Sequence, residues 1–310
     1  MRRMLFALGL AALTSLQVQA QTVQSARATT ILFVGNSFVH GNFEPVVSYR
    51  KGVVDENAGL SPNDPRFETI GGKPAGPFGG IAAIFKQFTD EAGLRYDVHV
   101  ELLSGGTLKT HYERALDIIK RPGWNVVVMH DLSTGPILET KAASPQDFER
   151  YTQLLEQAIH ATNPTAKIWL YETWPRADQT YPAGAPFAGK PITFMGNQLH
   201  DAYYAEFSRE GHLAGVAPAG DAWLRAIASG VAESNPYAPE SGKLDLWAVD
   251  NGHPSAWGAY LNACVIFETV TGRDPRTLGA NERAAMDLSI TRDQAQTLQR
   301  LAYETVTHAP

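Results

Sequence analysis

Short, almost continuously apolar runs recur along the chain. They alternate with stretches in which apolar residues return every three or four positions. The first pattern is typical of strands buried on both faces of a sheet, and the second of amphipathic helices. Strands are expected at 29–34, 96–103, 126–129, 167–171 and 213–217. Helices are expected near 80–91, 107–120, 148–161, 195–210, 222–228, 256–270 and 295–306.

Strands that alternate with helices through short turns predict a parallel sheet with right-handed crossover connections. The fold class expected is therefore α/β, a three-layer α/β/α flavodoxin-like sandwich with a parallel sheet of about five strands. The sequence has no internal repeat, domain linker or low-complexity segment, so residues 21–310 are expected to form a single domain. The stretch around 40–78 is rich in Gly, Pro, Asn and Asp. It is predicted to be an irregular loop that forms one wall of the site.

The first twenty residues have the pattern of an export signal. Arg2 and Arg3 precede a short apolar run, and Val18-Gln19-Ala20 is a small-x-small cleavage site. The apolar run is shorter than the roughly 18 residues that a membrane-spanning helix needs. We therefore expect residues 1–20 to be a signal peptide, and the mature protein to be secreted or periplasmic, without stable membrane insertion.

The net charge and the cysteine content exclude some classes of partner and of covalent cross-link. The formal net charge is −6 and no basic cluster occurs in the mature chain, which argues against nucleic acid as a partner. Cys264 is the only cysteine, so an intramolecular disulfide is excluded. Because Cys264 lies in an apolar helical stretch, we expect a buried, inert thiol.

Several chemically capable residues follow directly after predicted strands. Ser37, Gly105-Gly106 and His130-Asp131 would all lie at the carboxyl edge of the sheet, where ligands bind in open α/β folds. Acyl transfer needs a nucleophile, a base, a group that orients the base, and donors for the oxyanion. Ser37 can be the nucleophile, His253 the base and Asp250 its orienting carboxylate. The backbone N–H groups of Ser37 and Gly106 are candidate oxyanion donors.

These motifs resemble the SGNH (GDSL-like) hydrolase superfamily, which contains esterases and lipases on a flavodoxin-like sheet. Gly35-Asn36-Ser37 looks like its serine block, Gly105-Gly106 like its glycine block, and Asp250-x-x-His253 like its last block. The sequence around His253 is similar to the GNSF-type branch. The third block departs from the pattern, because Met129-His130-Asp131-Leu132 lacks the usual asparagine. His130 is then the candidate donor for the oxyanion at this block.

Each assignment has a structural alternative. Ser37 and Asp250 could only cap helices, and His253 could be a structural histidine. Trp174 and Arg176 follow the fourth strand and are candidate substrate-binding residues, although a large aromatic residue often closes a core. A metal site is conceivable from a set of four residues, but the spacing of its ligands does not support it. That set consists of His130, Asp131, Asp250 and His253.

The sequence therefore favours an exported serine ester hydrolase that acts through an acyl-enzyme on short acyl esters, such as O-acetylated carbohydrate. Its partner would be a small-molecule or glycan ester, and the mechanism needs no metal or organic cofactor. Two alternatives stay open. One is a carbohydrate-binding protein on the same fold with weak or lost turnover, and the other is an O-acyltransferase that shares the acyl-enzyme.

Overall fold

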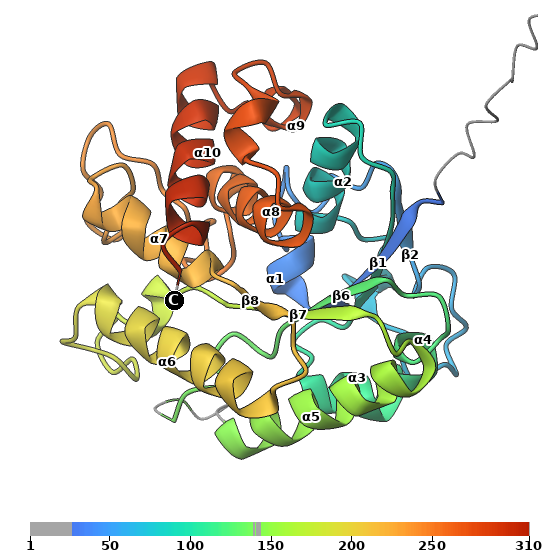
Figure 1. Cartoon of the computed structure of the whole chain (residues 1–310). Coiled ribbons are helices and arrows are strands. Elements are labelled where there is room, and N and C mark those ends of the chain that lie inside the picture. Colours follow the sequence, from blue (N-terminus) through green and yellow to red (C-terminus); the bar gives the residue numbers. More distant parts are fainter. Residues whose placement is uncertain (1–26, 139, 141–143, 310) are drawn as a thin grey trace, which may run out of the picture.

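The computed structural model describes residues 27–138, 140 and 144–309, and Figure 1 shows a single parallel sheet between two layers of helices. The fold class predicted from the sequence is confirmed, with six strands in the sheet instead of about five. The strands are β1 (Thr29–Gly35), β2 (Val53–Asp55), β5 (Tyr96–Leu102), β6 (Val126–Met129), β7 (Lys167–Tyr171) and β8 (Gly215–Ala217). A separate two-stranded ribbon consists of β3 (Thr69–Ile70) and β4 (Lys73–Pro74).

The spatial order of the strands is β2-β5-β1-β6-β7-β8, and all five pairings are parallel. Without β2 this is the 2-1-3-4-5 order of flavodoxin-like sheets, whose ligands bind at the carboxyl ends of the strands. Strand β2 comes from the stretch that was expected to be an irregular loop. It is three residues long and only partly buried, so it has no apolar run that a sequence pattern could reveal.

The helices are α1 (Ser37–His40), α2 (Ile81–Glu91), α3 (Leu108–Arg114), α4 (Leu116–Ile119), α5 (Pro145–Thr162), α6 (Ile192–Glu210), α7 (Ala219–Ala228), α8 (Ala256–Thr271), α9 (Arg283–Asp287) and α10 (Arg292–Val306). Short 3₁₀ turns lie at Ala177–Gln179 and Pro275–Leu278. The expected helix over 107–120 is interrupted at Ala115, whose φ of −125° and ψ of 8° separate α3 from α4. Helix α9 was not expected, because five residues show no periodicity.

Two apolar cores lie on opposite faces of the sheet. In β1, Phe33 faces the core under α2, α8 and α10, while Leu32 and Val34 face the core under α3, α5 and α6 (Figure 1). Successive side chains of a strand alternate between faces, which explains how one apolar run serves both cores. Cys264 on α8 is fully buried, as expected.

The predicted signal peptide lies outside the described residues. Among the residues that are described, no helix has the length and apolar character that crossing a membrane requires.

Candidate active site

Ser37 is positioned by the end of β1 and the start of α1. The chain turns at Asn36, which caps α1 by accepting the N–H of Phe38 with its side-chain oxygen at 3.0 Å. Ser37 is then the first residue of the helix. His253 lies in the turn before α8 and is 216 residues away in sequence, yet its Nε2 is 2.7 Å from Ser37 Oγ. The structure therefore brings two of the sequence-predicted residues into hydrogen-bond contact.

Asp250 closes the turn that carries His253. Its Oδ1 accepts the backbone N–H groups of Gly252 at 3.1 Å and His253 at 3.0 Å, and its Oδ2 lies 2.5 Å from His253 Nδ1. Burial alone would raise the pKa of Asp250, but its hydrogen bonds with His253 and Gly252 outweigh burial and lower the pKa to about 2. An ionised Asp250 holds a proton on Nδ1, so Nε2 faces the Ser37 hydroxyl as an acceptor.

The predicted oxyanion donors also lie at the carboxyl edge of the sheet, but some of them already donate to other protein groups. Ser37 carries the first N–H of α1, a group that the helix itself does not satisfy. The Gly106 N–H donates to the Leu103 carbonyl oxygen at 2.8 Å. His130 is fully buried, and its Nδ1 donates to the Asp131 carbonyl oxygen at 2.7 Å. Its Nε2 accepts the Asn36 N–H at 3.4 Å.

The charge state of His130 follows from its burial. Burial lowers the pKa of His130 to about 3, so the ring is neutral at neutral pH. A neutral ring has one N–H, and here that group is held by Asp131. Nothing in this arrangement aims an imidazole N–H of His130 at Ser37.

Asn36 is a structural link that the sequence analysis did not separate from a turn residue. Its side-chain N–H₂ donates to the Gly106 carbonyl oxygen at 2.9 Å and lies 3.5 Å from the Asp131 carbonyl oxygen, and the side chain is 1% exposed. Asn36 thus joins the loops after β1, β5 and β6. Gly35 permits this contact, since a Cβ at that position would lie 2.2 Å from His130 Nε2. An asparagine after a glycine was the only signal in the sequence.

Trp174 reaches the same edge but is fully buried. Its ring stacks on Phe38 at 4.2 Å and on Trp223 at 4.9 Å between centroids, and its indole N–H donates to the Gly252 carbonyl oxygen at 3.1 Å. The ring has no exposed face to offer a substrate. The contact instead supports the turn between Asp250 and His253.

Arg176 is partly exposed and already paired. Its guanidinium binds Asp178 at 2.9 and 2.7 Å and donates to Ser133 Oγ at 3.1 Å. In the same loop, the Asp178 N–H donates to the Asn251 carbonyl oxygen at 3.0 Å. The loop after β7 therefore braces the turn between Asp250 and His253.

Two phenylalanines contact the ring of His253. Phe38 and Phe43 pack edge-on against His253, with ring centroids 5.4 and 5.9 Å away. Phe43 lies in the stretch after α1 that was expected to form a wall of the site. Nothing in the local sequence indicated that Phe43 would contact His253 instead of lying in a loop away from the site.

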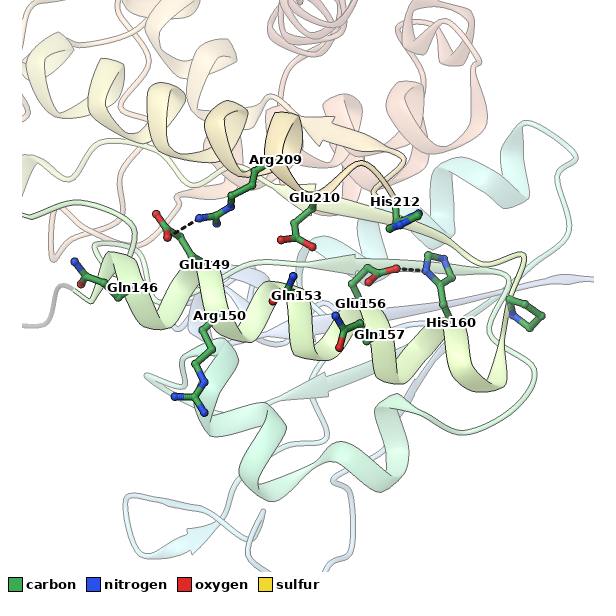
Figure 2. A pocket seen from close by; sticks show the side chains of 11 residues that line it. Gln146, Glu149, Arg150, Gln153, Glu156, Gln157, His160, Arg209, Glu210 and His212 are labelled. Carbon is green, nitrogen blue, oxygen red and sulfur yellow. Dashed lines mark hydrogen bonds and ion pairs between the residues drawn. The ribbon is translucent and has the colours of Figure 1, made fainter.

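The largest of the cavities described for this structure lies elsewhere. It has a volume of about 950 Å³ and runs along α5 from Gln146 to His160, beside the C-terminal end of α6, with polar lining residues such as Gln153 and Glu210 (Figure 2). Ser37, Asp250 and His253 do not line it. The hydrogen bonds among these three residues, and not cavity size, identify the candidate active site.

No family model matches the sequence, and no curated protein matches it. Among solved structures, the chain is similar to a DUF4886 family protein from Bacteroides uniformis, with 14% identity, 91% of this chain and 96% of that chain covered, and a TM-score of 0.60. A putative GDSL-like lipase from Parabacteroides merdae has 14% identity, coverage of 80% and 97%, and a TM-score of 0.49. A variant of an acetyl xylan esterase from Geobacillus stearothermophilus has 14% identity, coverage of 78% and 94%, and a TM-score of 0.45.

At such low identity the likeness concerns the fold alone. At the carboxyl edge of its flavodoxin-like sheet, this chain carries Ser37 directly after β1 and the Asp250–His253 turn directly before α8. The chain thus has an α/β sandwich fold like that of the DUF4886 family protein.

Proposed function

We propose that this protein is a serine ester hydrolase with Ser37, His253 and Asp250 as its catalytic triad. The observation that carries the proposal is the continuous chain of hydrogen bonds from Ser37 Oγ through the His253 ring to the Asp250 carboxylate. Groups so far apart in sequence form this geometry only when the fold brings them together, which favours a catalytic role over helix capping.

In the proposed reaction, Ser37 Oγ attacks the ester carbonyl carbon while His253 Nε2 takes the hydroxyl proton. Asp250 stabilises the imidazolium that forms. Collapse of the tetrahedral intermediate releases the alcohol, which takes its proton from His253. Water then attacks the acyl-enzyme with His253 again as base, and the acid leaves while Ser37 regains its proton.

The Ser37 N–H is the oxyanion donor that this proposal relies on first. The Gly106 N–H could also bind the oxyanion only if it gave up its hydrogen bond to the Leu103 carbonyl oxygen. His130 accepts the Asn36 N–H and so supports the loops. Each donor of this kind lowers the barrier by roughly 3 kcal/mol. Because only the Ser37 N–H is free to bind the oxyanion in this arrangement, we expect a modest turnover rate.

Short acyl esters are the proposed substrate class, with an acetyl group on a carbohydrate as the preferred example. The support is the export signal predicted for residues 1–20, which would place the enzyme where polysaccharides are found. Export is itself a proposal. Expression with the native N-terminus in a Gram-negative host should give periplasmic protein whose measured mass matches a chain that begins at Gln21. Cytoplasmic protein with the mass of the full chain would contradict export.

The first test is 4-nitrophenyl acetate hydrolysis by the wild type and Ser37→Ala. We expect kcat/KM to fall by about 10³-fold or more, because the nucleophile is removed while the fold is kept. Ser229→Ala, at an exposed serine after α7, is the matched control and should leave the rate unchanged. Equal rates in the wild type and Ser37→Ala would overturn the mechanism.

A second candidate function is carbohydrate binding with little or no turnover. It is favoured by one observation: both the Gly106 N–H and the His130 N–H are already held by carbonyl oxygens. Calorimetric binding of xylo-oligosaccharides without hydrolysis of their acetylated forms, even at high enzyme concentration, would select this function. Rapid ester hydrolysis would reject it.

A further inference from the structure

Three side chains with metal-ligating atoms meet beside the end of β7. Glu172 directly follows β7, His200 lies on α6 and Asp221 lies in the first turn of α7. One carboxylate oxygen of each acid and one ring nitrogen of His200 all lie within 4.8 Å of one another. Across residues 27–138, 140 and 144–309, no other group of three or more His, Cys, Asp or Glu residues comes this close.

Glu172 is the member of this group that needs a partner. The side chain is fully buried, and its Oε2 accepts the Asp221 N–H at 3.1 Å. Its Oε1 is buried without any hydrogen-bond partner. A buried carboxylate with an unsatisfied oxygen requires a cation or a proton.

His200 and Asp221 form the accessible side of the group. His200 Nδ1 lies 3.1 and 3.0 Å from the two Asp221 oxygens, and the two side chains are 30% and 23% exposed. Both residues line an open cavity of about 540 Å³, which Arg225 and Thr305 also line. An ion could enter from this cavity, and water in it could fill the positions that the protein leaves open.

We propose that Glu172, His200 and Asp221 together bind one divalent transition-metal ion of the zinc and manganese class. One imidazole and two carboxylates suit these ions, whereas calcium prefers oxygen ligands alone. Zinc ligands lie about 2.0–2.2 Å from the ion at the corners of a tetrahedron, so two of them are roughly 3.5 Å apart. The three ligand atoms lie within 4.8 Å of one another, so binding an ion would draw them together by up to about 1.3 Å.

The ion would have a structural role. It would tie the end of β7 to α6 and α7, just before the loop in which Trp174 and Arg176 brace the catalytic turn. The site is independent of the proposed esterase activity.

The competing occupant is a proton on Glu172, and Glu172→Gln separates the two. Glutamine mimics the shape of a protonated glutamate but cannot supply a carboxylate to a metal ion. Untagged protein, treated with chelator and dialysed, would be titrated calorimetrically with ZnCl₂, MnCl₂ and CaCl₂, and its Tm measured with and without each ion. His200→Ala removes a partly exposed ligand and gives a second variant whose folding is not at issue. Glu268→Gln, a buried carboxylate of α8 outside the group, is the matched control.

We expect zinc or manganese to bind the wild type with 1:1 stoichiometry and to raise its Tm by about 5 °C at a hundredfold excess over Kd. Glu172→Gln and His200→Ala should each weaken binding at least about 100-fold and lose the Tm rise, while Glu268→Gln should keep both. Absence of 1:1 binding in the wild type would overturn the proposal. So would binding that survives in Glu172→Gln and His200→Ala.

Discussion

At the scale of single residues, the candidate site depends on buried polar groups whose partners come from distant loops. The proposed nucleophile, base and orienting carboxylate could be selected from the sequence because each lies in a short motif. The roles of Asn36 and His130 could not, because their hydrogen bonds join residues 70 to 95 positions apart. No local pattern states which loop a buried amide or imidazole will face.

Asp131 gives a pH-dependent test at this scale. Burial raises its pKa to about 6, although the Leu108 N–H donates to its Oδ1 at 2.8 Å. Because the folded pKa lies above the unfolded value of about 3.9, the contribution of Asp131 to stability is fully present below pH 4 and is lost as the pH rises towards 6. Between pH 3.5 and 7, wild type should lose about 3 kcal/mol of unfolding free energy relative to Asp131→Asn.

Urea denaturation at a series of pH values measures that difference. Asn keeps an oxygen for the Leu108 N–H, so any remaining cost of the substitution should be the same at each pH. Asp117→Asn, at a carboxylate that is 93% exposed, is the control. If the unfolding free energies of wild type and Asp131→Asn changed with pH in parallel, folding would not raise the pKa of Asp131.

At the scale of elements, strands and long helices were predicted well and short pieces were not. Runs such as Val126–Met129 carry a strong signal because both faces are buried. Strand β2 and helix α9 are held by their neighbours, and the break between α3 and α4 falls at an alanine that favours helix. In these places tertiary contacts decided the structure and local preference did not.

The loop after β7 is the element with the clearest functional consequence. Trp174 and Asp178 bind the carbonyl oxygens of Gly252 and Asn251, so this loop sets the position of the Asp250–His253 turn. Trp174→Phe keeps an aromatic ring and removes the N–H. We expect kcat to fall about tenfold with KM nearly unchanged, because a lost hydrogen bond of about 1 kcal/mol loosens the base without touching the substrate.

Steady-state kinetics with 4-nitrophenyl acetate measure this effect. Trp124→Phe removes the same kind of hydrogen bond, from an indole N–H to the Ile118 carbonyl oxygen at 3.0 Å, away from the site. That control should keep its kcat. An unchanged kcat in Trp174→Phe would mean that the turn holds His253 without help from this loop.

At the scale of the whole molecule, the two cores share one sheet and neither is complete without it. Leu155 on α5 and Leu298 on α10 are both fully buried, on opposite faces. Each change to alanine should lower the unfolding free energy by about 2–5 kcal/mol. Because the two positions share no partner, the double variant should show the sum within about 0.5 kcal/mol.

Equilibrium urea denaturation, followed by both circular dichroism and tryptophan fluorescence, tests this prediction. A single transition with the same midpoint by both probes is expected for each variant. Two separated transitions in either single variant would show that the helix layers unfold independently.

The separation of 216 positions between Ser37 and His253 also orders events in time. Synthesis runs from the amino terminus, so Ser37 emerges early and His253 only after about four-fifths of the given sequence. A partial chain that stops before Asp250 holds the hydroxyl without the imidazole that would activate it. Under the proposed function, catalytic competence begins only once the chain extends past His253, and ester hydrolysis would report that the segments around Ser37 and His253 have met.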